Sequence, residues 1–213
     1  MRYVVWGKSK QYLWILIVLV MCQVMWHRVG EAGQPGPTEE IQTFNATLLD
    51  VMKRADELGY AGRYKLLEPV LKDTFAFTFM GTMSVGKFWA TMSEAQRKLF
   101  LDTYTEWSIA TYAGRFDGYS GERFELVSES SPVHSTITVV VKLIQANEGP
   151  ITFYYLMRFI EDRWRVVDIQ ISGVSQLALT RAQFTEVLKN RNYDALIAML
   201  KSKIAGFANA KKQ

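Results

Sequence analysis

The chain of 213 residues carries 25 Lys and Arg against 21 Asp and Glu, and 49% of its residues are hydrophobic. Its one cysteine and two histidines exclude a disulfide framework and a zinc site built from paired cysteines or histidines. The sequence also lacks the GxSxG, HExxH, glycine-rich phosphate-loop and calcium-loop patterns. We therefore expect a protein that uses no metal, no cofactor and no catalytic residues.

The first 32 residues are typical of a secretory signal peptide. A basic start precedes an apolar run at residues 13–21, and Gly30 and Ala32 stand at the small-residue positions before an expected cleavage site. The apolar run is shorter than the about 20 residues that a membrane helix needs. We expect cleavage after Ala32 and export to the periplasm. In the alternative, residues 24–26 extend the run, and an uncleaved leader tethers an interaction domain of a transport complex to the inner membrane.

Most of the excess positive charge lies in this leader. The leader holds four basic residues and one acidic residue, so the rest of the chain keeps 21 basic and 20 acidic residues. A nearly neutral domain offers no basic surface for nucleic acid. We expect no nucleic-acid partner.

Helical periodicity dominates residues 38–117. We expect one helix from an N-cap at Thr38 to Gly59, with apolar residues at helical spacing. Shorter helices are expected at residues 64–72 and 75–80, punctuated by Pro69 and Gly81. A long helix follows from Ser93, where Gln96 completes a capping box, towards Arg115. Its apolar residues fall broadly on one side: Leu99, Phe100, Tyr104, Trp107 and Ala110.

The periodicity changes to that of strands over residues 121–172. Four runs rich in β-branched and aromatic residues, at 122–129, 133–146, 151–161 and 163–172, are separated by turn residues. Short connections favour an antiparallel meander. Two C-terminal helices over residues 175–210, split at 190–192, complete the pattern. The sequence predicts an α+β fold with a four-stranded antiparallel sheet.

The predicted strands are apolar on both faces. In the third strand, Phe153 and Tyr155 alternate with Tyr154 and Leu156. A sheet with one face in water would alternate with polar residues, so helices must cover one face, and helices or a ligand the other. The pattern fits a fully covered core, and it also fits a pocket between sheet and helices that holds an apolar molecule.

Several short motifs along the chain resemble those of the toluene-tolerance family of periplasmic lipid carriers. They include Leu66-Leu67-Glu68-Pro69-Val70, Val85-Gly86-Lys87-Phe88-Trp89, Trp164-Arg165-Val166-Val167-Asp168-Ile169 and Ser172-Gly173-Val174-Ser175. The family includes MlaC, the carrier of the pathway that maintains outer-membrane lipid asymmetry. Residues 58–64 and 115–124 resemble its hopanoid-biosynthesis branch, HpnM.

The resemblance implies one lipid-binding domain at residues 33–213, with a helical subdomain packed on a sheet like that of nuclear transport factor two. It further implies a carrier of phospholipid or hopanoid that exchanges its cargo with transport proteins of the inner and outer membranes. The family commonly has an aspartate directly after the phenylalanine that Phe75 matches, whereas this chain has Ala76. Headgroup preference therefore does not transfer from the family.

Fourteen bulky apolar residues are candidates for the lining of a lipid cavity, because aromatic side chains and deformable methionines suit such a surface. They are Phe75, Phe79, Met80, Val85, Trp89, Tyr112, Phe124, Val139, Val141, Phe153, Tyr155, Met157, Ile169 and Ile171. Arg97, Arg115 and Arg181 are candidates either for pairing with a phosphate or for ordering helix ends.

An enzyme of the isomerase or cyclase kind is the main functional alternative. Such an enzyme would use Asp168 with Tyr154 or Tyr155 in an apolar pocket. A buried, unpaired Asp168 carboxylate that faces the cavity would favour the enzyme.

Overall fold

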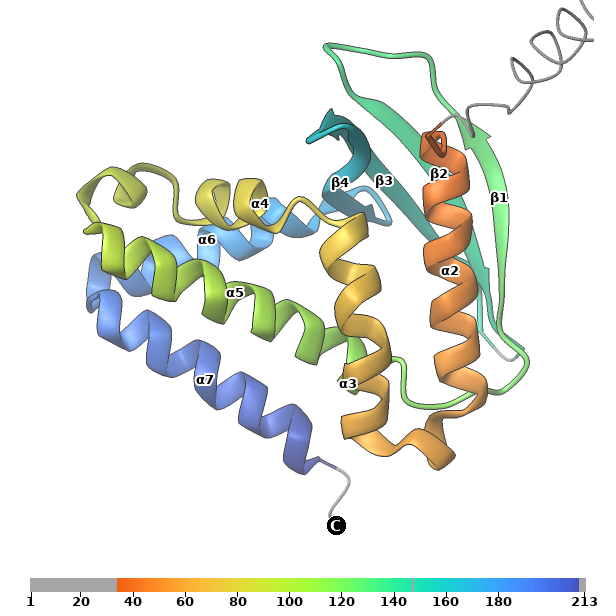
Figure 1. Cartoon of the computed structure of the whole chain (residues 1–213), viewed down its shortest axis with the longest axis horizontal. Helices are drawn as coiled ribbons and strands as arrows, with labels where there is room; N and C mark the ends of the chain where they lie inside the picture. The colour runs from red at the N-terminus through yellow and green to blue at the C-terminus, as the bar shows by residue number, and fades with distance from the viewer. Residues whose placement is uncertain (1–33, 147, 211–213) are drawn as a thin grey trace, which may run out of the picture. The chain divides into compact units, whose positions relative to one another are not determined.

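The computed structural model describes residues 34–146 and 148–210, so the expected signal peptide and its cleavage site lie outside the described residues. The described residues form six α-helices and a 3₁₀-helix, and the strands lie between the fourth and fifth α-helices in the chain; Figure 1 shows their arrangement. The helical elements before the sheet are α2 (Pro37–Lys53), α3 (Ala55–Thr74), α4 (Phe77–Val85), η1 (Gly86–Thr91) and α5 (Glu94–Arg115). After the sheet come α6 (Gln176–Asn190) and α7 (Tyr193–Asn209), which lie apart from α2 in Figure 1.

The strands form one antiparallel meander, which confirms the predicted α+β fold. Its order is β1 (Arg123–Glu129), β2 (Ile137–Ile144), β3 (Ile151–Ile160), β4 (Arg163–Ile171) and β5 (Val174–Ser175). The two-residue β5 was not predicted, because it pairs with β4 directly after Gly173 and is too short to show an alternation. Glu161 and Asp162 both have positive φ, of 52° and 60°, as a two-residue hairpin between β3 and β4 requires.

The predicted start of the first helix was wrong by two residues. Gly36 is the N-cap of α2 and Pro37 is its first residue, a position where the missing N–H of proline costs nothing. Thr38 lies inside the helix instead, and its backbone N–H and hydroxyl both donate to Glu129 Oε2. These bonds join the start of α2 to the end of β1.

The predicted breaks between the next helices were also misplaced. The first helix ends at Lys53, and Gly59 lies within α3 at a kink, with φ of 57°. α3 continues through Pro69 at the cost of one intrahelical hydrogen bond. α4 continues through Gly81, where an added Cβ would lie 2.7 Å from Leu101 Cδ2. Gly81 is therefore explained by the close approach of α4 to α5, not by a helix end.

The predicted N-terminus of the long helix is confirmed. Ser93 Oγ accepts from the Gln96 backbone N–H at 3.2 Å, and Gln96 Oε1 accepts from the Ser93 N–H at 2.9 Å. Phe100, Tyr104 and Ala110 of this helix are buried, as expected. Leu99 is not part of the buried side, since it remains 43% exposed.

The sheet has one face that packs against helices and one that is partly open. α2 lies across the first face (Figure 1), where Tyr155 and Met157 of β3 are buried. The opposite face carries Tyr154 and Leu156, which are half-buried. We predicted that both faces of the sheet are covered. This holds at β4, which α6 contacts, whereas the side chains of β2 and β3 on the second face stay half-buried.

A buried arginine joins the start of α3 to the end of α5. Arg63 of α3 is 2% exposed, and its Nε donates to the Ala113 carbonyl near the end of α5 at 2.8 Å. Its Nη1 donates to the Ala55 carbonyl, at the junction of α2 and α3, at 3.0 Å. Carbonyls in the last turn of a helix lack intrahelical partners. Arg63 therefore satisfies a carbonyl at the end of α5 and fixes that end against the α2–α3 junction.

Candidate functional site

The fourteen residues predicted to line a lipid cavity all belong to one continuous hydrophobic cluster between the sheet and the helices. Eight of them are buried: Phe75, Met80, Val85, Val139, Val141, Tyr155, Met157 and Ile169. The other six pack against these while remaining partly exposed: Phe79, Trp89, Tyr112, Phe124, Phe153 and Ile171. The fold thus brings together residues from α4, η1, α5 and four strands.

Aromatic rings form the centre of this cluster. Phe44 of α2 meets three rings edge to face, with centroid distances of 5.3 Å to Phe75, 5.7 Å to Tyr112 and 6.3 Å to Tyr155. Such edge-to-face contacts are the favoured geometry of aromatic pairs. Phe44 was not among the predicted lining residues, although its helical spacing had placed it on the apolar side of its helix. The sequence gives no sign that this helix lies over the sheet.

The segment between α3 and α4 holds Phe75 over the sheet. Phe75 ends α3 in an extended conformation, and its N–H donates to the Leu71 carbonyl at 2.9 Å. The next N–H, of Ala76, donates to the Val166 carbonyl of β4 at 3.0 Å. The backbone at Phe75 is therefore held from both sides, by its own helix and by the sheet.

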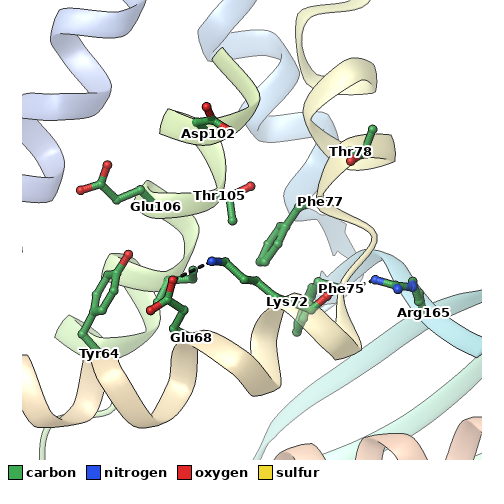
Figure 2. Close-up of a pocket in the computed structure, with 11 residues that line it drawn as sticks. Tyr64, Glu68, Lys72, Phe75, Phe77, Thr78, Asp102, Thr105, Glu106 and Arg165 are labelled. Atoms are coloured by element: carbon green, nitrogen blue, oxygen red, sulfur yellow. Dashed lines mark hydrogen bonds and ion pairs between the residues drawn. The ribbon is translucent and has the colours of Figure 1, made fainter. Parts of the chain in front are cut away.

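A pocket of about 500 Å³ opens between α3, α4 and α5 (Figure 2). This volume is within the range of small-molecule sites. Phe75, Phe77 and Ile109, which belong to the hydrophobic cluster, supply its apolar part. Its polar residues are Tyr64, Glu68, Lys72, Thr78, Asp102, Thr105, Glu106 and Arg165. The pocket therefore joins a polar rim to the edge of the apolar core.

Ion pairs organise the rim of the pocket. Lys72 Nζ pairs with Glu68 Oε1 at 2.6 Å, as Figure 2 shows. Arg165 Nη1 donates to the Lys72 carbonyl at 3.1 Å, and its Nη2 pairs with Glu161 at 3.1 Å. The Nε of Arg165 is buried and has no hydrogen-bond partner among the described residues. A buried donor without a partner is costly, and this nitrogen has almost no accessible surface in the structure.

The tyrosines of the site remain neutral phenols at ordinary pH. Burial, together with the negative charges of Glu68 and Glu106, raises the pKa of Tyr64 to about 12. Burial also raises the pKa values of Tyr112 and Tyr155 above the usual range. The Tyr155 hydroxyl donates to Asn45 Oδ1 of α2 at 3.3 Å. These groups can donate hydrogen bonds, and none of them gains the acidity that a general acid requires.

The pocket and the predicted residue set overlap at Phe75. The other thirteen predicted residues lie in the packed cluster beside or behind it. Sequence reasoning missed the polar rim, above all Tyr64, Lys72 and Arg165. These residues come from α3 and β4, and only the tertiary arrangement brings the end of α3 to this strand.

Asp168 supports α6 from β4. Its Oδ2 accepts from Ser175 Oγ at 2.6 Å, and its Oδ1 accepts from the Leu177 N–H at 3.0 Å. A carboxylate at a helix N-terminus is stabilising. The enzyme alternative paired Asp168 with Tyr154 or Tyr155. Tyr155 lies on the opposite face of the sheet from Asp168, since Leu156 is the register partner of Asp168. The Asp168 carboxylate, which accepts two hydrogen bonds, is not the unpaired group that would favour the enzyme.

Two of the candidate arginines lie beside the 3₁₀-helix η1. Arg97 Nε donates to the Trp89 carbonyl at 3.1 Å, and its guanidinium lies 5.2 Å from the centre of the Trp89 ring. Arg181 packs on Gly86, where an added Cβ would lie 3.0 Å from its Nη2. For Arg97, which donates to a backbone carbonyl of η1, the structure supports the helix-end interpretation.

The part of the chain that the structure describes comprises residues 34–146 and 148–210. No helix in this part of the chain combines the length and apolar character needed to cross a membrane. The same part has no group of three or more His, Cys, Asp or Glu side chains placed to hold a metal ion.

The described part of the chain thus combines a helical layer on an antiparallel sheet with an apolar cluster and a polar-rimmed pocket at its edge. The chain belongs to the MlaC protein family, whose model matches residues 42–202.

Two known proteins illustrate this relationship. The intermembrane phospholipid transport system binding protein MlaC of Haemophilus influenzae is 29% identical over 126 residues, which cover 57% of this chain and 59% of that protein. A phospholipid-binding protein from Ralstonia solanacearum, solved in complex with a phospholipid, superimposes with a TM-score of 0.69 and 20% identity. The match covers 79% of this chain and 97% of that one. At this identity the likeness shows the shared fold.

Proposed function

We propose that this protein is a periplasmic carrier that binds a phospholipid or a hopanoid without altering it covalently and moves it between the inner and outer membranes. The continuous apolar cluster between sheet and helices is the observation that carries this proposal, in a chain of the MlaC family. Two related proteins support a lipid as the cargo. One is a binding protein of an intermembrane phospholipid transport system, and the other was solved in complex with a phospholipid.

The apolar cluster supplies the driving force for binding. Burial of a lipid chain contributes about 0.8 kcal/mol for each methylene removed from water. To admit a chain, the cluster must open, and Phe75 and Phe77 are placed to allow this. Their rings stack with centroids 5.7 Å apart and form part of the boundary between pocket and cluster. Displacement of this pair would connect the rim of the pocket with the core around Tyr155.

The test of this proposal replaces one half-buried cluster residue by a charged one. In Phe153→Asp, a carboxylate enters the apolar region, where an unpaired charge is costly. The matched control is Phe159→Asp, because Phe159 lies on the same strand and is 53% exposed. We expect Phe153→Asp to weaken binding of fluorescent phospholipid or hopanoid at least about tenfold, which corresponds to about 1.4 kcal/mol, and Phe159→Asp to leave it unchanged.

Circular dichroism must show both variants folded. Equal binding by the two variants would contradict the assignment of the cluster as the lipid site. Failure of the native protein to bind either lipid would contradict the proposed function itself.

The periplasmic part of the proposal has a separate test. Expression of the full chain in a Gram-negative host, followed by fractionation and intact-mass measurement, should give a periplasmic protein that begins at Gly33. An intact N-terminus in the membrane fraction would instead support the tethered form of the protein.

A further inference from the structure

The charge of the expected mature chain is unevenly distributed, although its total is close to zero. Residues 169–213 carry seven Lys and Arg against two Asp and Glu. Residues 33–168 carry fourteen Lys and Arg against eighteen Asp and Glu. The C-terminal part therefore has a formal charge of +5, and the part before it has a formal charge of −4. Such an asymmetry creates a field that can orient a protein near a charged surface.

The positive charge lies on α6 and α7 and on the residues that follow them. We call residues 176–209, which comprise both helices and their junction, the C-terminal hairpin (Figure 1). Four of its five cations are exposed, and Lys203 is half-buried. Lys211 and Lys212 follow in the sequence and lie outside the described residues. The cations of the hairpin are Arg181, Lys189, Arg191, Lys201 and Lys203, and its acidic residues are Glu186 and Asp194.

The cations of the C-terminal hairpin have no carboxylate partner within the described residues. All ion pairs in this part of the chain join residues between positions 50 and 165. There, Lys72, Lys98 and Arg163 each pair with an acidic side chain. In the hairpin, by contrast, Lys203 lies over an aromatic ring, with its Nζ 5.9 Å from the centre of Trp107. The positive charge of the hairpin is therefore available to an anionic partner.

We propose that the C-terminal hairpin docks the protein on the anionic lipid surface of a membrane. This inference rests on the proposed function, because a carrier that moves lipid between membranes has to reach a membrane surface. It adds a docking surface and an orientation, with α6 and α7 towards the membrane. The choice of cargo does not depend on this surface.

The types of side chain on this surface favour a membrane over an acidic protein. Protein interfaces are depleted of lysine, and aromatic and other large apolar side chains are enriched in them. Five of the seven basic residues from position 169 onward are lysines. Among the described residues of α6 and α7, Leu179 is the one large apolar side chain that is exposed, at 54%. Dispersed cations on flexible side chains suit anionic headgroups, because each Lys or Arg near the membrane surface adds to the attraction.

Flotation of the purified mature protein with vesicles tests the docking surface. One set of vesicles contains phosphatidylcholine alone, and the other contains equal parts of phosphatidylcholine and phosphatidylglycerol. We expect binding to the anionic vesicles at low salt, and binding to the neutral vesicles at least about tenfold weaker. Binding to the anionic vesicles should fall as added salt screens the charges.

Paired substitutions test whether the hairpin carries the attraction. Each Lys or Arg near an anionic membrane surface strengthens binding about fivefold. Lys189→Gln combined with Lys201→Gln should therefore weaken binding to the anionic vesicles at least about tenfold. The matched control combines Lys53→Gln with Lys65→Gln, which removes the same charge from exposed positions on α2 and α3. This control should change binding by less than about twofold, and circular dichroism must show both variants folded.

The outcomes separate the docking surface from the carrier function. Equal binding to neutral and anionic vesicles, binding to neither, or unchanged binding of the hairpin variant overturns the docking surface. Equal losses in the two paired variants also overturn it, because total charge would then explain the attraction. Uptake of fluorescent lipid from solution reports on the carrier function by itself. Intact uptake with failed docking leaves that function standing, whereas a native protein without uptake contradicts it.

Discussion

Replacement of the buried Arg63 by methionine should strongly destabilise the fold. The side chain is 2% exposed and donates two short hydrogen bonds, at 2.8 Å to the Ala113 carbonyl and at 3.0 Å to the Ala55 carbonyl. Methionine is close in size and cannot donate. A hydrogen bond that involves a charged group contributes about 1.5–3 kcal/mol. Because methionine restores part of the packing, we expect a loss of about 3–5 kcal/mol in the free energy of unfolding.

Urea denaturation followed by circular dichroism measures this loss directly. The matched control is Arg54→Met, on the same stretch of helices, whose guanidinium is exposed and pairs with Asp50 and Glu57. Exposed pairs contribute about 0–1 kcal/mol. If Arg63→Met unfolds within about 1 kcal/mol of Arg54→Met, then Arg63 does not hold the helix ends together and the reasoning fails.

Three further predictions concern stability. Gly114→Ala should destabilise the protein by about 1–3 kcal/mol, because the added Cβ would overlap the Phe207 ring. Gly206→Ala has open space around the added Cβ and should stabilise α7 by about 0.5–1 kcal/mol. Urea midpoints of the two variants that shift in the same direction would contradict this. Ser93→Ala should cost about 1 kcal/mol through loss of the α5 cap, and an unchanged urea midpoint would contradict the capping assignment. The folded-state pKa of Tyr64, about 12, lies above its ordinary value of 10.0. The contribution of the neutral Tyr64 to the free energy of unfolding is therefore complete below pH 10 and is lost as the pH rises towards 12. Tyr64→Phe should flatten this part of the plot of unfolding free energy against pH, and an identical plot for the variant would argue against the burial of Tyr64.

Local patterns predicted the elements whose causes are local. The capping box at Ser93 and Gln96 fixed the start of α5, since both partners lie within one turn. The strands were predicted from alternation and turn residues, and their antiparallel order follows from short connections. The apolar alternation also placed Tyr155 and Met157 on one face of β3, where the structure confirms them buried.

The remaining features depend on contacts between distant segments. Gly81 resembles a helix end in the sequence, but its reason is Leu101 of α5. The burial of Arg63 is set by the carbonyl of Ala113, 50 positions away. The polar rim of the pocket arises because α3 ends beside Arg165 of β4. No periodicity within a single element carries this information, so the sequence identified the apolar cluster and missed the pocket at its edge.

The central claim, that this protein binds a lipid without altering it, has one direct measurement. Native mass spectrometry of the purified protein, followed by solvent extraction and lipid analysis, identifies whatever it retains from the cell. The account predicts a protein–lipid complex that releases an intact phospholipid or hopanoid of unchanged mass. A folded sample that carries no lipid and also fails to take up either lipid from vesicles, or one that returns a chemically altered lipid, would contradict it.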